Sequence, residues 1–265
     1  MKIGVIGLGV IGSACKYGFE KLGHQVSFHD IAFETTINDV LDSEIIYVCV
    51  PTPQMGGGSC DTSIVEKVVE DLNENKFTGI IAIKSTVKPT TTEMLIKKYW
   101  ELNICFVPEF LRERCAITDF TENHDLLAVG THEQYIYDKV VECHGKYPKT
   151  TQWLSPTEAE LLKYYSNVFN AVRIIFANEM YEICKAVKAD YTKIKDTFIK
   201  RGTTTDMYLD VNENFRGYAG VCLPKDVSAL ASFVRELDLN LDLFETIDYE
   251  NKKFKATVFD GMREK

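Results

Sequence analysis

The feature that most constrains the fold is a glycine pattern near the start of the chain. The pattern G-x-G-x-x-G at 7–12 joins a short apolar run at 2–7 to a helical pattern at 10–22, and Asp30 ends a second strand-like segment at 25–30. A strand, a glycine turn, a helix and a second strand ending in an acid are together typical of a dinucleotide-binding unit. A glycine turn in an unrelated α/β fold is the alternative.

Each glycine has a separate predicted role. Gly7 permits the tight turn, Gly9 lets the backbone approach a pyrophosphate, and Gly12 allows the helix to pack closely on the strand. The helix N-terminus supplies N–H donors and positive potential to the phosphates. Asp30 would accept hydrogen bonds from ribose hydroxyls and repel a 2′-phosphate, so the sequence favours NAD over NADP.

The first part of the chain alternates between short apolar runs and helical patterns. Near-continuous apolar strands separated by helices indicate a parallel sheet that is covered on both faces. We therefore predict a doubly wound, Rossmann-type domain over 1–153. The predicted strands are 2–7, 25–30, 44–50, 78–83, 103–107 and 124–129, and the helices between them are 10–22, 62–75, 90–100 and 131–143.

The remaining residues, 154–265, predict a mostly helical domain. Ser155, Pro156 and Glu158 form a helix start with a cap, a proline at the first position and an acid in the first turn. The pattern then continues to Lys188, about 30 residues, with apolar residues on more than one face, which predicts a homodimer built on this helix. Shorter helices are predicted near 190–199, 225–237 and 241–260, with a loop at 212–221.

Composition narrows the possible partners and compartment. Lys and Arg number 30 against 39 Asp and Glu, a net charge of −9, which argues against a nucleic acid partner. No apolar run is long enough to span a bilayer, and the N-terminus begins directly with a strand-like segment. Eight cysteines without a C-x-x-C pair are expected to be reduced thiols, which favours the cytoplasm. We expect no metal site.

Three segments follow predicted strands, at 50–53, 84–87 and 107–113. They should therefore meet at the sheet edge where open α/β folds bind ligands. Each also has a plain structural interpretation, since prolines end strands and Ser85 or Thr86 could cap a helix.

Lys163 and Asn167 are spaced i, i+4 on the long predicted helix, so they share one face. An ammonium and an amide side by side could stabilise a developing oxyanion. A solvated pair on a helix surface is the alternative.

Cys222 lies between a glycine-containing loop and Pro224, which is well placed to start a helix. A position just before a helix N-terminus and near Lys225 lowers a thiol pKa and favours the nucleophilic thiolate. A buried structural cysteine is the alternative, and it is the default for the other seven.

Taken together, these segments resemble the UDP-glucose/GDP-mannose dehydrogenase family, most closely its UDP-glucose 6-dehydrogenases. The most specific parts are Cys-Leu-Pro-Lys-Asp at 222–226 and Pro-Glu-Phe-Leu-Arg-Glu at 108–113, in register with Ser-Thr-Val at 85–87 and with 159–167. Related hydroxyacid dehydrogenases share the glycine pattern and a Lys-x-x-x-Asn pair, but they lack Cys-x-Pro-Lys-Asp.

The resemblance implies an enzyme that oxidises the C6 primary alcohol of a nucleotide sugar, such as UDP-glucose, to a carboxylate with two NAD and one water. Cys222 would be the nucleophile that carries a thiohemiacetal and then a thioester. Lys163 and Asn167 would stabilise the oxyanion, and Glu109 would be the general acid/base through a water. Asp226 would position that water or Lys163, and Thr86 would join the water network.

The resemblance also implies two sets of binding residues. The cofactor set adds to the glycines and Asp30 the residues Val10, Ile11, Val50, Thr52, Pro53, Ser85, Thr86, Val87 and Glu113. The substrate set is Glu109, Phe110, Leu111, Lys163, Asn167, Phe215, Tyr218, Gly220 and Lys225.

The sequence also departs from the family pattern. Thr90 replaces a usual glycine, Arg216 stands where a small or apolar residue is usual, and the family's C-terminal nucleotide-binding domain is expected to be missing from these 265 residues. Two alternatives therefore stay open: a dehydrogenase of a smaller hydroxy substrate, and a non-catalytic NAD-binding homologue.

Overall fold

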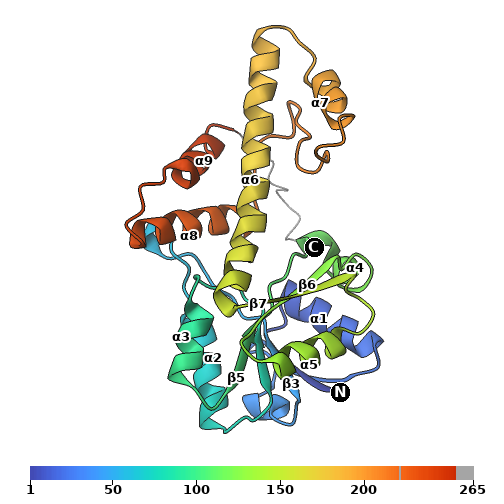
Figure 1. The fold of residues 1–265 in the computed structure, drawn as a ribbon, viewed down its shortest axis with the longest axis vertical. Coiled ribbons are helices and arrows are strands. Elements are labelled where there is room, and N and C mark those ends of the chain that lie inside the picture. The colour runs from blue at the N-terminus through green and yellow to red at the C-terminus, as the bar shows by residue number, and fades with distance from the viewer. Residues whose placement is uncertain (221, 255–265) are drawn as a thin grey trace. The chain divides into compact units, whose positions relative to one another are not determined.

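The computed structural model describes residues 1–220 and 222–254, which form two units. The first unit comprises Met1–Met55 and Cys60–Lys163, and the second comprises Gly56–Ser59 and the chain from Tyr164 onward. The division falls within one continuous helix, α6 (Pro156–Ala186), which is the long helix of Figure 1.

The first unit is built on a seven-stranded sheet with the order β2-β1-β3-β4-β5-β6-β7. All neighbouring strands are parallel except β5 and β6, which meet in antiparallel fashion at Phe106 and Gly130. The strands are β1 Lys2–Ile6, β2 Gln25–His29, β3 Ile45–Val48, β4 Ile80–Ile83, β5 Asn103–Phe106, β6 Leu126–Gly130 and β7 Thr150–Leu154.

Two features of this sheet differ from the prediction. Strand β7 was not predicted, because it is an edge strand with a polar, exposed sequence (Thr-Thr-Gln-Trp-Leu) that lacks a continuous apolar run. The sheet is also not parallel throughout. A short 3₁₀ helix (Glu113–Cys115) and the six-residue helix α4 (Ala116–Thr121) lie between β5 and β6, and β6 runs antiparallel to β5 instead of starting again from the same end of the sheet.

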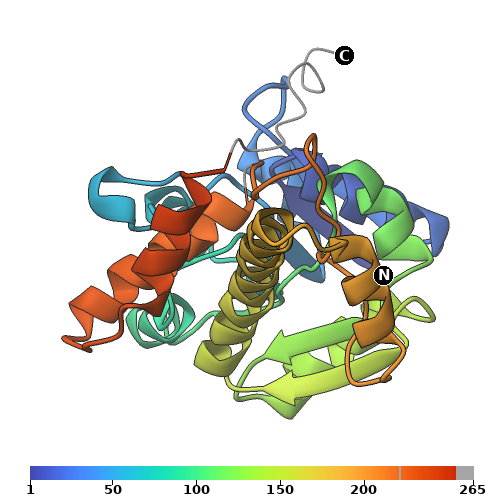
Figure 2. The same ribbon diagram turned by 90° about the horizontal axis from the view of Figure 1, so that it is seen from above.

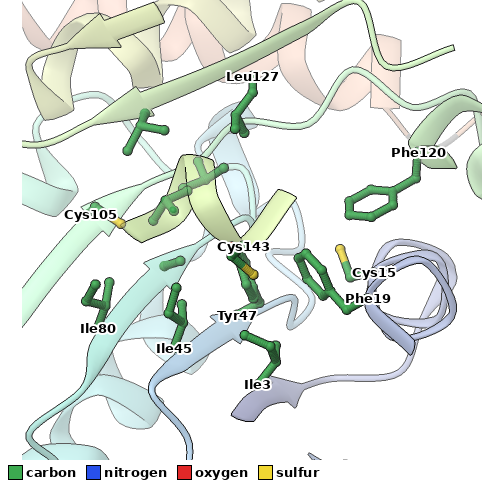
Figure 3. Packing of buried hydrophobic residues seen from close by; sticks show 14 of the residues in the cluster. Ile3, Cys15, Phe19, Ile45, Tyr47, Ile80, Cys105, Phe120, Leu127 and Cys143 are labelled. Atoms are coloured by element: carbon green, nitrogen blue, oxygen red, sulfur yellow. The ribbon is translucent and has the colours of Figure 1, made fainter. Parts of the chain in front are cut away.

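Helices cover both faces of the sheet, which confirms the doubly wound fold. Successive β3 residues alternate between the two cores, with Tyr47 in one and Ile46 in the other. The first core, in Figure 3, packs Phe19 against Tyr47 at 4.8 Å and against Phe120 at 5.3 Å between ring centroids. The helices besides α4 are α1 Val10–Lys21, α2 Ser63–Glu74, α3 Thr91–Lys98 and α5 Gln134–His144.

The start of α6 follows the prediction. The Ser155 backbone N–H and hydroxyl both donate to a Glu158 carboxylate oxygen, at 2.8 and 2.7 Å, and Pro156 is the first helical residue. The reciprocal bond from Glu158 N–H to Ser155 Oγ, at 3.4 Å, completes a capping box.

The second unit continues with α7 (Tyr191–Ile199), α8 (Cys222–Glu236) and α9 (Leu243–Asn251). Helices α8 and α9 lie side by side in Figures 1 and 2, and they share a core with the middle of α6. The helix predicted at 241–260 is observed as α9, which begins at Leu243 and ends at Asn251. Residues 255–260 of the prediction lie outside the described residues. No helix in the described part of the chain is long and apolar enough to cross a membrane.

A short segment between β3 and α2, Gly56–Ser59, belongs to the second unit. A Cβ atom at Gly58 would lie only 2.3 Å from Ser228 Oγ, and Arg235 Nη2 donates to Gly57 O at 2.8 Å. Both partners are on α8, so this loop packs its backbone directly onto the helix that begins at Cys222.

Candidate functional site

The glycine turn has the geometry that its pattern predicts. Gly7 has a φ of +91°, and a Cβ atom there would lie 2.7 Å from Cys49 O. A Cβ at Gly12 would lie 1.8 Å from Gly7 O, so only glycine permits this close approach of helix to strand. Nothing lies within 4 Å of a Cβ at Gly9, which leaves the backbone at the start of α1 open to a ligand.

Asp30 holds this turn and carries a negative charge beside it. Its carboxylate accepts hydrogen bonds from the backbone N–H of Ala32 at 2.8 Å and of Leu8 at 2.6 Å. These two bonds lower the pKa of Asp30, so the side chain is ionised at neutral pH. The predicted position of Asp30 next to the glycine turn is thus found in the structure.

A cavity of about 270 Å³ opens beside the N-terminus of α1, lined by Val10 and Ser13 from α1 and by Glu113 and Cys115 from the segment before α4. Two predicted cofactor residues, Val10 and Glu113, therefore face one cavity, whereas Ile11 packs partly against the first core. An open helix N-terminus, an ionised acid and this cavity fit a dinucleotide.

The predicted residues after β3 and β4 lie at the carboxyl edge of these strands. Ser85 Oγ donates to Val50 O at 2.7 Å, which ties the two segments together, and Thr52 is buried beside the exposed Pro53. Thr86 O accepts a hydrogen bond from Cys60 Sγ.

Val87, another residue of the predicted cofactor set, belongs to a core of the first unit. Its side chain is fully buried in the second core, where it packs with the apolar residues of α2 and α3. The side chain therefore anchors the loop, and cofactor binding by Val87 stays a prediction.

Lys163 and Glu109 form a buried ion pair in the first unit. Lys163 Nζ lies 2.7 Å from Glu109 Oε1 and donates to Glu109 O at 2.5 Å. The second carboxylate oxygen accepts the Leu111 N–H at 2.7 Å, and the ammonium lies 5.8 Å from the centre of the Phe110 ring. Both side chains are more than nine-tenths buried, so each charge depends on its partner.

In the second unit, Asp226 joins two other predicted residues. The Asn167 amide donates to Asp226 Oδ2 at 2.6 Å, and Lys225 Nζ lies 3.2 Å from Oδ1. Asp226 is 1% exposed, so its carboxylate fixes which side of the Asn167 amide is the donor. The family resemblance implied a water or Lys163 as the partner of Asp226, whereas Asn167 and Lys225 are the partners observed in this unit.

Cys222 is the first residue of α8 and is exposed, unlike the other cysteines. All eight cysteines fall within the described residues; five are buried, and Cys49 and Cys115 are half-buried. The helix was predicted to start at Pro224, so Cys222 lies within its first turn instead of just before it. The unpaired N–H groups of a first helical turn favour a nearby thiolate.

The loop before Cys222 is held by two asparagines that the sequence analysis missed. Asn178 Oδ1 accepts hydrogen bonds from Arg216 Nε at 2.8 Å and from Gly217 N at 3.1 Å. Asn251 exchanges two hydrogen bonds with the Tyr218 backbone, at 2.8 and 2.9 Å. The available signal for Asn178 was a polar residue within an apolar stretch of helix.

The three predicted substrate residues of this loop differ in how exposed they are to solvent. Phe215 is exposed, and Gly220 has a φ of +86° in open space. Tyr218, however, is 3% exposed and packs its ring into the core of the second unit, where burial raises the pKa of its hydroxyl. The Tyr218 ring is thus part of this core, and substrate binding by Tyr218 stays a prediction.

Among the described residues, no group of three or more histidine, cysteine, aspartate or glutamate side chains is placed to hold a metal ion.

The chain is similar to several known nucleotide-sugar dehydrogenases. A UDP-glucose 6-dehydrogenase of Rickettsia felis is 30% identical over 84% of this chain and 51% of its own length. A GDP-mannose 6-dehydrogenase of Pseudomonas aeruginosa is 24% identical over 98% and 70%. The solved UDP-glucose dehydrogenase of Pyrobaculum islandicum shares the fold with a TM-score of 0.86 at 24% identity, covering 95% of this chain and 68% of that one.

The chain spans about half the length of the first curated relatives that it matches. Residues 29–146 match the sequence model of the NAD binding domain of the UDP-glucose/GDP-mannose dehydrogenase family, which confirms the prediction of NAD as cofactor. Residues 157–253 match the central domain of the same family. Because the two matches together span more than half of the chain, the protein belongs to the UDP-glucose/GDP-mannose dehydrogenase family.

Proposed function

We propose that the protein oxidises the C6 primary alcohol of a nucleotide sugar, UDP-glucose in the first instance, to a carboxylate. The observation that best supports this proposal is the exposed Cys222 at the start of α8. Asp226 on the same helix orients the Asn167 amide. One alcohol, one water and two NAD⁺ would give one carboxylate, two NADH and three protons. When bound, NAD accepts the hydride in each oxidation.

Cys222 serves the second oxidation. Its thiolate adds to the aldehyde carbon, so a C–S bond forms and the carbonyl oxygen takes a proton to give a thiohemiacetal. Loss of a hydride from this carbon and of the hydroxyl proton leaves a thioester. Attack by water then breaks the C–S bond and returns the thiolate.

Lys163 and Asn167 would act on the C6 oxygen. They lie four residues apart on α6 and thus on one face of that helix. The ammonium and the amide N–H groups stabilise negative charge on this oxygen as it develops. Glu109, whose carboxylate is held by Lys163 and by the Leu111 N–H, would move the proton through a water.

The direct test is to incubate the purified chain with NAD and UDP-glucose and to follow NADH and UDP-glucuronate together. Two NADH per carboxylate are expected. GDP-mannose and UDP-N-acetylmannosamine serve as competing substrates. Oxidation of small hydroxy acids only, or NAD binding without turnover of any nucleotide sugar, would contradict the proposal.

The Asp30 carboxylate is expected to set the cofactor preference. Asp30→Ala removes the acceptor for the ribose hydroxyls and for the Leu8 N–H, so NAD affinity should fall on the order of tenfold or more, given the typical strength of hydrogen bonds to charged groups. NADP affinity should fall less, because a like charge is also removed. Titration of both cofactors checks this, with Asp39→Ala as a control at another hydrogen-bonded carboxylate. Equal losses for NAD and NADP would contradict it.

The dimer remains a prediction, and α6 supplies its surface. Large apolar side chains stay exposed along one face of this helix in the second unit: Tyr165, Phe169, Phe176 and Ile183, followed by Val187 just after the helix end. Covering this face with the same face of a second copy would remove it from water. Sedimentation at micromolar concentration should show a dimer, and replacing Phe169 and Phe176 by glutamate should give a monomer. A monomeric native chain would contradict this prediction.

A further inference from the structure

Glu160 is a buried carboxyl in the first unit that the proposed chemistry does not use. Its side chain is fully buried, and its two carboxylate oxygens accept separate backbone hydrogen bonds. The Thr90 N–H donates to Oε2 at 2.6 Å, and the Thr92 N–H donates to Oε1 at 2.7 Å. Glu160 therefore connects α6 to a segment about 70 residues earlier in the chain.

These two N–H groups belong to the start of α3. Thr90 is the N-cap residue, and its own side chain makes no capping hydrogen bond. Glu160 takes over this role from another helix and places a carboxylate where the helix dipole favours one. Thr90 also has a φ of +80°, a strained conformation for a β-branched residue, and such strain persists only where its surroundings hold it.

The segment before Thr90 is the loop that carries Ser85 and Thr86. Its first end is fixed to β3 and the residues after it, because Ser85 Oγ donates to Val48 O at 3.3 Å and to Val50 O at 2.7 Å. Its other end is a tight turn in which Thr91 donates to Lys88 O from both its N–H and its hydroxyl, at 3.1 and 2.6 Å. The position of this loop is thus set by β3 at one end and by Glu160 at the other.

The other side of the connection is equally fixed. A Cβ atom at Gly130 would lie 2.6 Å from Ala159 Cβ and 2.9 Å from the Pro156 Cα, so the first turns of α6 pack directly on β6. Lys163 follows Glu160 by three residues on this rigid helix and reaches Glu109. Glu160 and Lys163 therefore lie on one turn of α6, and this turn packs directly on β6.

We propose that Glu160 is a positioning residue that ties the cofactor loop, residues 85–92, to the turn of α6 that carries Lys163. For the oxidation itself this rests on the proposed function. For NAD binding it stands on its own, because Ser85 and Thr86 lie in the predicted cofactor set.

The connection should be sensitive to pH. Burial raises the pKa of Glu160 to about 7, and the charge of Glu93 on α3 acts in the same direction. His132, after β6, lies 2.9 Å from Glu93, and on α6 itself the neighbouring charges are Glu158, bound to Ser155, and Lys163, paired with Glu109. The ionised carboxylate accepts both N–H groups, whereas the protonated form has one acceptor oxygen fewer for them.

Two opposite trends follow from the sign of this shift. The folded pKa lies above the ordinary value of 4.5, so the Glu160 contribution to stability is largest below that value and is lost as pH rises towards 7. NAD binding should change in the other direction and weaken as pH falls through about 7, because the loop loses a hydrogen bond. A merely structural role would make both properties change together.

The experiment compares the full native chain with Glu160→Gln and with Glu158→Gln, a control because glutamine also serves in a capping box. NAD affinity and thermal stability are measured from pH 4.5, the ordinary pKa of a glutamate, to above the raised pKa of Glu160, which is about 7. Native protein and control should bind NAD several-fold more weakly at the acidic end, whereas Glu160→Gln should bind weakly throughout with a flat profile. Any effect of His29, next to Asp30, is common to all three proteins.

An unchanged pH profile of NAD binding in Glu160→Gln would overturn the proposal. If that variant does not fold, hydrogen exchange in the native chain decides instead. The amides of Thr90 and Thr92 should lose protection at acidic pH after correction for intrinsic exchange, and constant protection would overturn the proposal. None of these measurements needs sugar oxidation, so their failure is distinct from failure of the proposed function.

Discussion

Replacement of Cys222 by alanine is expected to lower carboxylate formation on the order of 10⁴-fold, the scale seen when a covalent nucleophile is removed. NAD affinity should stay close to that of the native chain, because Cys222 is not among the residues predicted to bind the cofactor. Without a thiolate the aldehyde has no covalent acceptor, so the first oxidation should leave aldehyde. Product analysis by mass spectrometry, together with NAD titration, checks both statements.

Two further variants sharpen this result. Cys222→Ser should permit a weak first oxidation and then stop before the acid, because a hydroxyl has a much higher pKa and is a poorer nucleophile. Cys184→Ala is the matched control: this thiol is buried in a core cluster, so its loss should affect stability and leave the product unchanged. One equivalent of iodoacetamide should label Cys222 first, as the exposed cysteine of the eight. Full carboxylate formation by Cys222→Ala would make Cys222 a structural residue.

The sequence was informative where local rules decide the structure. The glycine turn, the capping box of α6 and the alternation of apolar runs each depend on residues close together in the chain, and all three are found. The edge strand β7 was missed because half of its environment is water, so its residues need not be apolar. The start of α8 was placed at Pro224 by a valid preference, yet the helix extends to Cys222.

The candidate site shows the limit of sequence patterns more clearly. Asn167 and Asp226 were both predicted as site residues from the sequence. Their hydrogen bond to each other was not predicted, because 59 residues separate them in the chain. The same holds for Glu160, which looks like an ordinary helix residue until its two backbone partners are known. Tyr218 and Val87 were predicted to bind ligands because of their place in a motif. The sequence did not predict that their side chains are packed in the hydrophobic cores.

Removal of the Lys163 ammonium should have the largest combined effect on stability and activity. Lys163→Ala leaves the Glu109 carboxylate more than nine-tenths buried without its cation, and breaking such a pair typically costs about 3–5 kcal/mol of unfolding free energy. Hydride transfer should fall on the order of 10²-fold or more, since stabilisation of the C6 oxygen is lost as well. Denaturant unfolding and turnover are the two measurements.

A double variant separates the structural role of the pair from its chemical role. Replacing Lys163 by methionine and Glu109 by leucine removes both charges and keeps most of the volume, so stability should recover to near that of the native chain or above it. Activity should not recover, because neither the ammonium nor the proton-transferring carboxylate is restored. If the double variant oxidised the sugar at the native rate, Lys163 and Glu109 would be a buried structural pair only, and the site that performs the chemistry would have to be sought elsewhere.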